Sequence, residues 1–273
     1  MWNTLIVDPM TNALLLIYDL IGQNFGLAII VFTIVVRLVT YPLNAKQIKS
    51  TSALQDLQKS KDWQEVQEKY KKDREKLAQE QMKLYKKAGI NPFGSCLPTL
   101  IQFPIIIGLY QAISAAMAAT PLQLIAFSQR IYSFFPNLAT LVPLNGRFLW
   151  MDLSQPERLF LPFLPIGIPT LAILVVISSY FQTKLMTPPT TNSNDQSAAM
   201  GRMMGVYMPF FLGWLAYSFP AGLGVYFVAS NLVGIGQYAL MARLKQKAQL
   251  QSGAGAKTAG PAPKLKGGQQ TRK

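Results

Sequence analysis

Long stretches without charged residues alternate with short charged segments along the chain. Residues 20–36 contain 17 consecutive uncharged positions, residues 159–183 contain 25, and residues 88–129 and 203–242 contain 42 and 40. A helix that crosses the hydrocarbon core of a bilayer needs about 20 mostly apolar residues. Each stretch is therefore long enough to supply at least one membrane-spanning helix.

Turn signals divide the two longest stretches. The sequence Phe-Pro-Ala-Gly at 219–222 splits the last stretch into two spans, and Ala-Thr-Pro at 119–121 ends the span before it. The pattern predicts an all-α fold, a polytopic membrane protein with five transmembrane helices and a cytoplasmic helical hairpin. The predicted spans are 22–43, 93–117, 162–186, 203–219 and 222–242.

The distribution of Lys and Arg predicts how these helices are oriented. Segment 44–92 holds 12 basic residues and the tail 243–273 holds 8, whereas the connection 118–161 holds only 3. Basic residues accumulate on the cytoplasmic side of a membrane. We therefore expect segment 44–92, the short loop 187–202 and the tail in the cytoplasm. The N-terminus is then outside, and we expect an interfacial helix at 1–21 and an interfacial segment at 118–161 on that side.

The segment 44–92 is predicted to form the hairpin from two helices. The first covers 45–59, and the second begins at Asp62, which can cap it, with Glu65 completing a capping box. Gly89 is expected to end the second helix. Apolar positions at helical spacing form a stripe that would face the partner helix or the membrane surface: Trp63, Val66, Tyr70, Leu77 and Leu84. A plain solvated hairpin and a protein-docking role are both compatible with this pattern.

The tail 243–273 is rich in Gly, Ala, Gln, Pro and Lys and is predicted to be disordered. Its positive charges would attract anionic lipid headgroups or ribosomal RNA, or would serve only to enforce the topology. The candidates for partner binding come from both cytoplasmic segments: Trp63, Tyr70, Lys71, Lys72, Arg243, Lys245 and Lys247.

The composition excludes most kinds of active site. The 273 residues include a single cysteine, Cys96, and no histidine, so a disulfide framework, a multi-cysteine metal site and a histidine-based catalytic group are excluded. Only 14% of the residues are charged and the mean hydropathy is +0.22, which agrees with a membrane protein. We expect no enzymatic activity, no cofactor and no metal.

Arg37 is the one charged residue in the interior of a predicted span. At 1.5 Å per residue it lies about 9 Å from the cytoplasmic end of its helix. An arginine in hydrocarbon costs about 3 kcal/mol on insertion scales, which favours a position facing a watery cavity. Snorkelling of the side chain to the inner headgroups is the alternative. Neutral polar residues on several spans favour the cavity: Thr33, Thr40, Gln102, Gln111, Ser178, Ser179, Gln182, Tyr226, Ser230, Asn231 and Gln237.

Three segments resemble one known family. The sequence FTIVVRLVTYPLN at 32–44 is similar to the first core span of the YidC-type membrane insertases, which are relatives of the mitochondrial oxidase-assembly and thylakoid Albino proteins. The sequence NPFGSCLPTLIQFPIIIGLY at 91–110 resembles their second core span, and FPAGLGVYFVASN at 219–231 resembles the entry to their last span. The resemblance extends over about residues 22–245 and indicates the minimal five-span form.

The resemblance implies a hydrophilic groove, open to the cytoplasm and sideways to lipid, that passes substrate segments into the bilayer. The function it implies is that of an insertase, alone or with the Sec translocon. The candidate groove residues are Arg37, Thr33, Gln102, Tyr226, Phe227, Asn231 and Ser179. The expected partners are newly made membrane proteins, the ribosome, the Sec translocon and anionic lipids. We expect the protein in a bacterial plasma membrane or a thylakoid membrane.

An anion transporter that binds its substrate at Arg37 is the main alternative. Secondary transporters typically show internal repeats and coupling acids, and the sequence shows neither. The three family-like segments favour the insertase.

Overall fold

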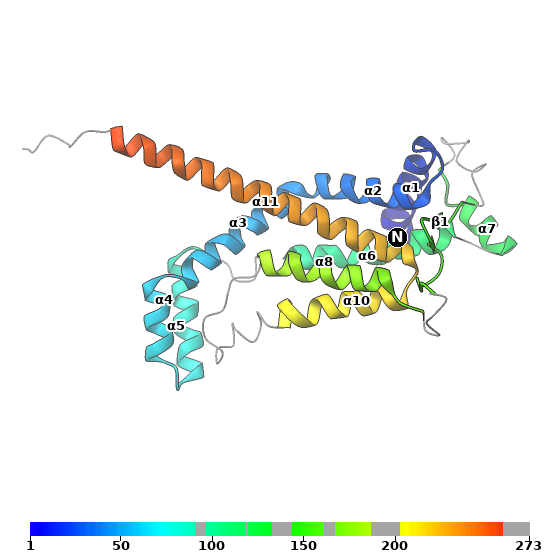
Figure 1. The fold of residues 1–273 in the computed structure, drawn as a ribbon. Helices are drawn as coiled ribbons and strands as arrows, with labels where there is room; N and C mark the ends of the chain where they lie inside the picture. Colours follow the sequence, from blue (N-terminus) through cyan, green and yellow to red (C-terminus); the bar gives the residue numbers. More distant parts are fainter. Residues whose placement is uncertain (91–96, 118–119, 133–143, 161–166, 187–202, 259–273) are drawn as a thin grey trace, which may run out of the picture.

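The computed structural model describes the chain except residues 91–96, 118–119, 133–143, 161–166, 187–202 and 259–273. The described part consists mostly of helices (Figure 1). In chain order these are η1 (Asn3–Val7), α1 (Asp8–Leu20), α2 (Phe25–Val39), α3 (Tyr41–Gln58), α4 (Lys61–Lys69), α5 (Arg74–Lys87), α6 (Leu97–Ala116), α7 (Pro121–Ser128), α8 (Thr170–Met186), η4 (Met203–Tyr207), α10 (Met208–Ser218) and α11 (Ala221–Thr258). A two-stranded antiparallel sheet, β1 (Arg147–Phe148) and β2 (Met151–Asp152), lies between α7 and α8 in the sequence.

The long helix α11 is the centre of the bundle. It packs against α2, α6, α8 and α10, and α10 also packs along α8 (Figure 1). Two glycines permit close approaches of α10 and α11 to α8. A Cβ atom at Gly213 would lie 2.2 Å from Val176 Cγ2, and one at Gly224 would lie 2.6 Å from Leu171 Cδ2. Small residues of this kind let helices in a membrane pack closely.

One described helix, α11, is long and apolar enough by itself to cross a membrane, over Ala221–Leu244. The apolar parts of α6 and α8, Gln102–Ala116 and Thr170–Met186, are shorter than a full span. The helical segment Asn3–Leu20 and helix α2 are long and apolar enough to cross a membrane only when taken together, and they are bent by 120° relative to each other. Several residues that would complete the predicted spans lie outside the described part of the chain. The five-span arrangement therefore stays a prediction.

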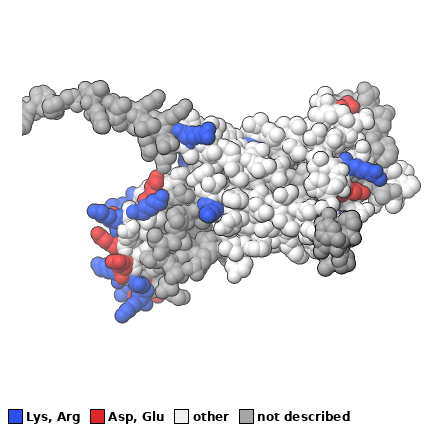
Figure 2. Space-filling view, viewed as in Figure 1, with Lys and Arg blue, Asp and Glu red and all other residues white. Residues whose placement is uncertain are grey.

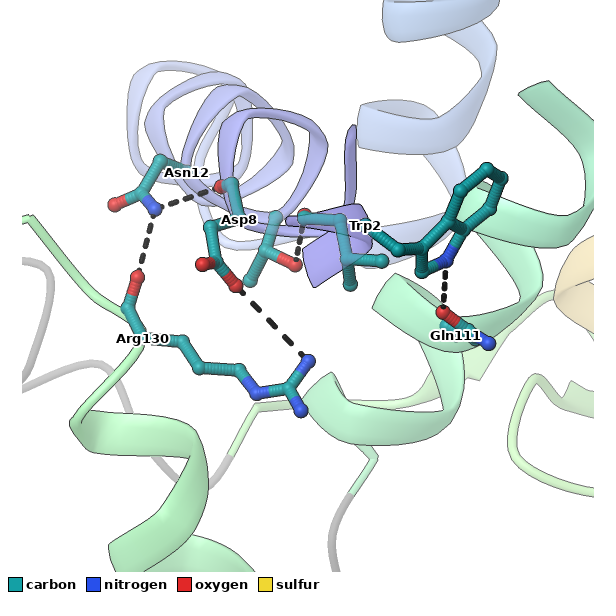
Figure 3. Close-up of polar contacts among 7 residues, drawn as sticks. Trp2, Asp8, Asn12, Gln111 and Arg130 are labelled. Atoms are coloured by element: carbon teal, nitrogen blue, oxygen red, sulfur yellow. Dashed lines mark hydrogen bonds and ion pairs between the residues drawn. The ribbon is translucent and has the colours of Figure 1, made fainter. Parts of the chain in front are cut away.

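The N-terminal helix α1 is anchored to the bundle by polar contacts that Figure 3 shows. Asn12 Nδ2 donates hydrogen bonds to the carbonyl oxygens of Asp8 (2.8 Å) and Arg130 (2.9 Å), and the Arg130 guanidinium lies 4.0 Å from the Asp8 carboxylate. Before α1, at the start of the chain, Trp2 Nε1 donates a hydrogen bond to Gln111 Oε1 on α6 at 2.8 Å. Apolar residues of α1 are also part of the buried core: Leu14, Leu15 and Tyr18. The helix predicted within 1–21 is therefore present and packs on the bundle.

The hairpin differs from the prediction in its helix boundaries. The helix predicted at 45–59 begins earlier, as α3, directly after α2. The second predicted helix is two helices, α4 and α5, and the prediction that Asp62 caps the first of them is wrong. Ser60 has the extended backbone of an N-cap and accepts the N–H of Trp63 at 3.3 Å, which places Asp62 inside the first turn. Asp73 caps α5 in the same way.

The apolar seam of the hairpin lies between α4 and α5. Trp63 is 2% exposed and its ring centroid lies 5.2 Å from that of Tyr85, while Leu77 is also buried. The predicted end of the hairpin is confirmed: Gly89 has φ +66°, and Ile90 N donates to the carbonyl of Tyr85 at 2.9 Å. Two residues of the predicted stripe, Trp63 and Leu77, are therefore buried in the hairpin, whereas Val66, Tyr70 and Leu84 are half-buried.

The prediction of a disordered tail is wrong for residues 243–258, which continue α11 as helix. This part of the tail contains Ala, Leu, Lys, Gln and Arg, which are strong helix formers. A helix that extends an existing one has no nucleation cost, so low hydrophobicity does not prevent it. The remainder of the tail, 259–273, lies outside the described residues.

Charged side chains gather at one end of the molecule. Figure 2 shows Lys, Arg, Asp and Glu concentrated at the end formed by α3, α4 and α5, next to a broad band almost without charge and a few charges at the far end. A band of this kind is what a membrane-embedded region requires.

Candidate functional site

Arg37 lies on the side of α2 that faces α11. Its Nε and Nη2 atoms both donate hydrogen bonds to Ser230 Oγ, at 3.0 Å and 2.6 Å. Two turns further along α11, Gln237 Nε2 donates to the backbone carbonyl of Arg37 at 3.1 Å. The side chain and the backbone of Arg37 are thus both held by α11.

Arg37 is part of the wall of a small, partly open cavity, in which the centre of a water molecule can occupy about 20 Å³. Residues from α2, the start of α3, α6 and α11 line it: Thr33, Val36, Arg37, Thr40, Leu43, Asn44, Gln102, Ile105 and Tyr226. The hydroxyls of Thr33 and Thr40 donate to carbonyls of their own helix, those of Ile29 and Val36, at 2.6 Å and 2.8 Å. The lone pairs of Thr33, and the one that Thr40 keeps after accepting from Asn44, can accept hydrogen bonds in the cavity.

A second group of polar contacts connects the walls of the cavity. Gln102 Nε2 on α6 donates to the phenol oxygen of Tyr226 on α11. Tyr226 is also hydrogen-bonded to Ser230, one helical turn later. The polar side chains therefore form a continuous chain from α6 through α11 to Arg37 on α2.

No carboxylate lies within 4.0 Å of Arg37 among the residues that the structure describes. The ion pairs found in this part of the chain all lie elsewhere: Lys76 with Asp73, Lys83 with Glu80 and Arg130 with Asp8. The hydrogen-bond partners of Arg37 are neutral, so its positive charge is not cancelled locally. A cavity of this composition attracts anionic groups.

The structure brings together four of the seven candidate groove residues. Arg37, Thr33, Gln102 and Tyr226 line the cavity, whereas the other three do not. Asn231 Nδ2 donates to the hydroxyls of Ser178 and Ser179, at 3.0 Å and 2.7 Å, in a buried contact between α8 and α11. Phe227 is buried in the apolar core, with its ring centroid 5.7 Å from that of Tyr226.

Helix periodicity explains this division. Phe227 and Asn231 are four positions apart and share one face of α11, while Tyr226 and Ser230 share another. Thr40, predicted to favour the cavity, also lines it, whereas Asn44 was not among the candidates; Asn44 donates to the Thr40 hydroxyl at 3.3 Å. The spacing of Asn44, seven residues after Arg37 and so on the same helix face, was the available signal.

The candidate partner-binding residues differ in accessibility. Trp63 is buried inside the hairpin, so it is a packing residue and not an exposed docking residue. Lys71 and Lys72 are exposed at the turn between α4 and α5, and Arg243 is exposed on α11. Tyr70 is half-buried, with Lys69 Nζ 5.5 Å from its ring centroid. Lys245 and Lys247 lie on the helical backbone of α11, and their side chains are outside the described part.

Comparison with known proteins places the chain in a family. The family model described as 60Kd inner membrane protein matches residues 16–249. A membrane protein insertase YidC of Oceanobacillus iheyensis is 35% identical over 246 residues, which are 88% of this chain and 83% of that protein. The chain belongs to the YidC family of membrane protein insertases. The resemblance inferred from the three sequence segments is thereby confirmed.

Other relatives and one solved structure agree with the YidC family. Membrane protein insertase MisCA of Bacillus subtilis is 33% identical, over 86% of this chain and 77% of that protein. Inner membrane protein ALBINO3 of Arabidopsis thaliana chloroplasts is 31% identical over 89% of this chain and 53% of that protein. A crystal structure of an active YidC insertase with its first transmembrane domain resolved matches with a TM-score of 0.52 and 28% identity. The match covers 86% of this chain but 46% of the solved one. These relatives indicate a membrane protein of the bacterial or thylakoid inner-membrane type, and none of their names describes a catalyst.

Proposed function

We propose that this protein inserts segments of newly made membrane proteins into the lipid bilayer, and that the cavity beside Arg37 receives their hydrophilic parts. The observation that carries the proposal is that, among the described residues, Arg37 pairs with neutral groups only, in a polar cavity lined by four helices. Family membership supports the insertase activity itself.

The physical task is to move polar groups through a medium that cannot hydrate them. Each unpaired backbone or side-chain polar group in hydrocarbon costs several kcal/mol. Thr33, Thr40 and Asn44 line the cavity with donors and acceptors that replace part of the lost water. The barrier to translocation falls, and transfer of the apolar part of the substrate into lipid supplies the driving force.

Arg37 adds selectivity for acidic groups. At an effective dielectric constant of 20, a carboxylate 4 Å from the guanidinium is attracted by about 4 kcal/mol before its desolvation is subtracted. Even half of that energy changes occupancy of the cavity by more than about tenfold. The mechanism needs no covalent step, nucleotide or metal.

The predicted topology fits this mechanism. With five spans and the charged hairpin in the cytoplasm, the cavity lies toward the cytoplasmic side, where a new polypeptide arrives. Lys71, Lys72 and Arg243 are exposed at that end and are suited to contact anionic lipid or ribosomal RNA. Cooperation with the Sec translocon is a further part of the proposal.

Co-sedimentation with ribosomes tests the RNA contact. A Lys71→Glu, Lys72→Glu double variant and a chain shortened before residue 243 should both sediment less with ribosomes, and unchanged sedimentation of both would contradict the contact.

The groove is tested by protease-protected insertion into liposomes that contain this protein alone. The substrate is a small single-span protein with an acidic translocated tail, and its matched control carries Asn and Gln in place of Asp and Glu. We expect Arg37→Ala to reduce insertion of the acidic substrate about tenfold and to leave the neutral one nearly unchanged. The exposed residue Arg243, changed to Ala, serves as the control variant.

Two outcomes would contradict parts of this proposal. Equal insertion of the acidic substrate by wild type and a folded Arg37→Ala variant would exclude the groove charge. Uptake of small anions into liposomes, together with no insertion of either substrate, would favour the anion transporter instead.

A further inference from the structure

Among the residues that the structure describes, Ser230 is the one side chain that accepts hydrogen bonds from the guanidinium of Arg37. It is 3% exposed and accepts hydrogen bonds from both Nε and Nη2. A guanidinium has five N–H donors in a rigid planar fork. Two of them point at Ser230, so three remain for a ligand that enters the cavity.

The orientation of the Ser230 hydroxyl is itself determined by its neighbours. Ser230 has one proton, and its hydrogen bond to Tyr226 uses it, because both N–H groups of Arg37 require an acceptor. The phenol of Tyr226 is buried and also accepts a hydrogen bond from Gln102 on α6. The lone pairs of Ser230 are therefore directed at Arg37 by a chain of contacts that begins on another helix.

The chemical character of this anchor matters as much as its position. An aspartate at the same place would also hold the guanidinium, in a shorter and stronger charge-assisted contact, but it would cancel the positive charge. Serine holds the guanidinium and leaves its charge intact. The backbone contact from Gln237 anchors the helix but not the guanidinium, so it cannot replace Ser230 in this role.

We propose that Ser230 is a positioning residue that presents Arg37 to acidic substrate segments as an uncancelled charge, and that its neutral hydroxyl sets the preference of the cavity for such segments. This inference rests on the proposed function of the cavity. It predicts that substitutions at Ser230 change the ratio between insertion of acidic and neutral substrates, and not insertion as such.

The test compares three variants with the same two substrates, the acidic tail and its Asn/Gln counterpart. Ser230→Ala removes the anchor and is expected to lower the acidic-to-neutral insertion ratio about fivefold. Ser230→Asp keeps an acceptor but cancels the charge, and is expected to abolish the preference. Ser230→Thr keeps the neutral hydroxyl and is expected to retain the wild-type ratio.

Ser179→Ala is the matched control, because Ser179 is also a buried serine with a side-chain hydrogen bond, but it contacts Asn231 and not Arg37. It should leave the ratio unchanged. A parallel loss of both substrates in Ser230→Ala would show a merely structural role and overturn the inference. So would a wild-type ratio in both Ser230→Ala and Ser230→Asp.

The same experiment distinguishes the proposed role of Arg37 in the cavity from the proposed role of Ser230. If Arg37→Ala lowers the ratio but Ser230→Ala and Ser230→Asp do not, the proposed function stands and the role of Ser230 is refuted. If Arg37→Ala leaves the ratio unchanged, the groove charge is refuted and the inference about Ser230 falls with it.

Discussion

Glu157 provides a sharp test of how the segment around β2 is joined to the bundle. It is a carboxylate only 5% exposed, at the N-terminus of α8. Its Oε1 atom accepts hydrogen bonds from Trp150 Nε1 at 3.1 Å and from the Thr170 hydroxyl at 2.7 Å, and its Oε2 atom accepts the N–H of Leu171 at 3.0 Å. Glu157 therefore connects the segment around β2 to the first turn of α8.

The expected cost of Glu157→Gln follows from these contacts. The amide retains one oxygen, so its NH₂ group must face at least one donor that the carboxylate had satisfied. One hydrogen bond to a charged group is worth about 1.5–3 kcal/mol. The favourable interaction of a negative charge with a helix N-terminus adds about 0.3–1 kcal/mol. We expect a loss of about 2–4 kcal/mol.

Thermal unfolding in detergent, followed by circular dichroism, measures this loss. For a chain of this size each kcal/mol lowers the melting temperature by about 2–4 °C, so Glu157→Gln should lower it by about 4–16 °C. Glu65→Gln, at an exposed position of α4, is the control and should have little effect. A melting temperature for Glu157→Gln equal to that of wild type would refute the reasoning.

Three further predictions concern packing and protonation. A Cβ atom at Gly26 would lie 2.1–2.7 Å from ring carbons of Phe148, so Gly26→Ala should cost about 1–3 kcal/mol by overpacking, and adding Phe148→Leu should restore part of the melting temperature. Trp63→Ala should accelerate hydrogen exchange in α4 and α5 and leave α2 unchanged, since Trp63 fills the hairpin seam; unchanged exchange in α5 would contradict this. Burial raises the pKa of Tyr85 above its usual 10.0, so the folded hairpin favours the neutral phenol. The stability of the folded hairpin should be constant below pH 10.0 and should decrease as the pH rises from there through the raised pKa of Tyr85. Trp63 fluorescence, in a chain whose other tryptophans are Phe, should show this loss, and Tyr85→Phe should abolish it.

The cavity beside Arg37 shows how much of the site could be predicted from the sequence alone. Arg37 was identifiable as the one charge inside a predicted span, and the family-like segments indicated Thr33, Gln102 and Tyr226 as its neighbours. These four do line one cavity. The spacing along each helix was informative because residues three or four positions apart share a face.

Contacts between Arg37 and residues of distant helices could not be predicted from spacing within one helix. Ser230, 193 positions from Arg37, was visible only as one of several polar residues. The rotation of α11 decides whether Ser230 or Asn231 faces Arg37, and a helix that is apolar on nearly every side carries no pattern that fixes its rotation. Asn231 consequently looked equally suited to the groove, although it contacts α8.

Local sequence signals in the hairpin and the tail gave wrong predictions for another reason. Ser60 and Asp62 are both good capping residues, and the choice between them depends on where the backbone leaves its extended conformation. The low hydrophobicity of the tail predicts disorder, yet residues 243–258 are helical because they continue α11. Tertiary context and helix propagation decide these cases.

The central claim is that the polar part of a substrate occupies the cavity beside Arg37 during insertion. Disulfide formation tests it directly, with a stalled substrate carrying a cysteine next to an acidic residue. Cys96 is first changed to Ser, and a new cysteine is placed at Thr40 in the cavity wall or, as control, at Ile173, 46% exposed on α8. The account predicts a disulfide with Thr40→Cys that weakens when Arg37→Ala is added, and little with Ile173→Cys. Normal insertion without a disulfide at Thr40→Cys, or equal disulfides at both positions, would contradict it.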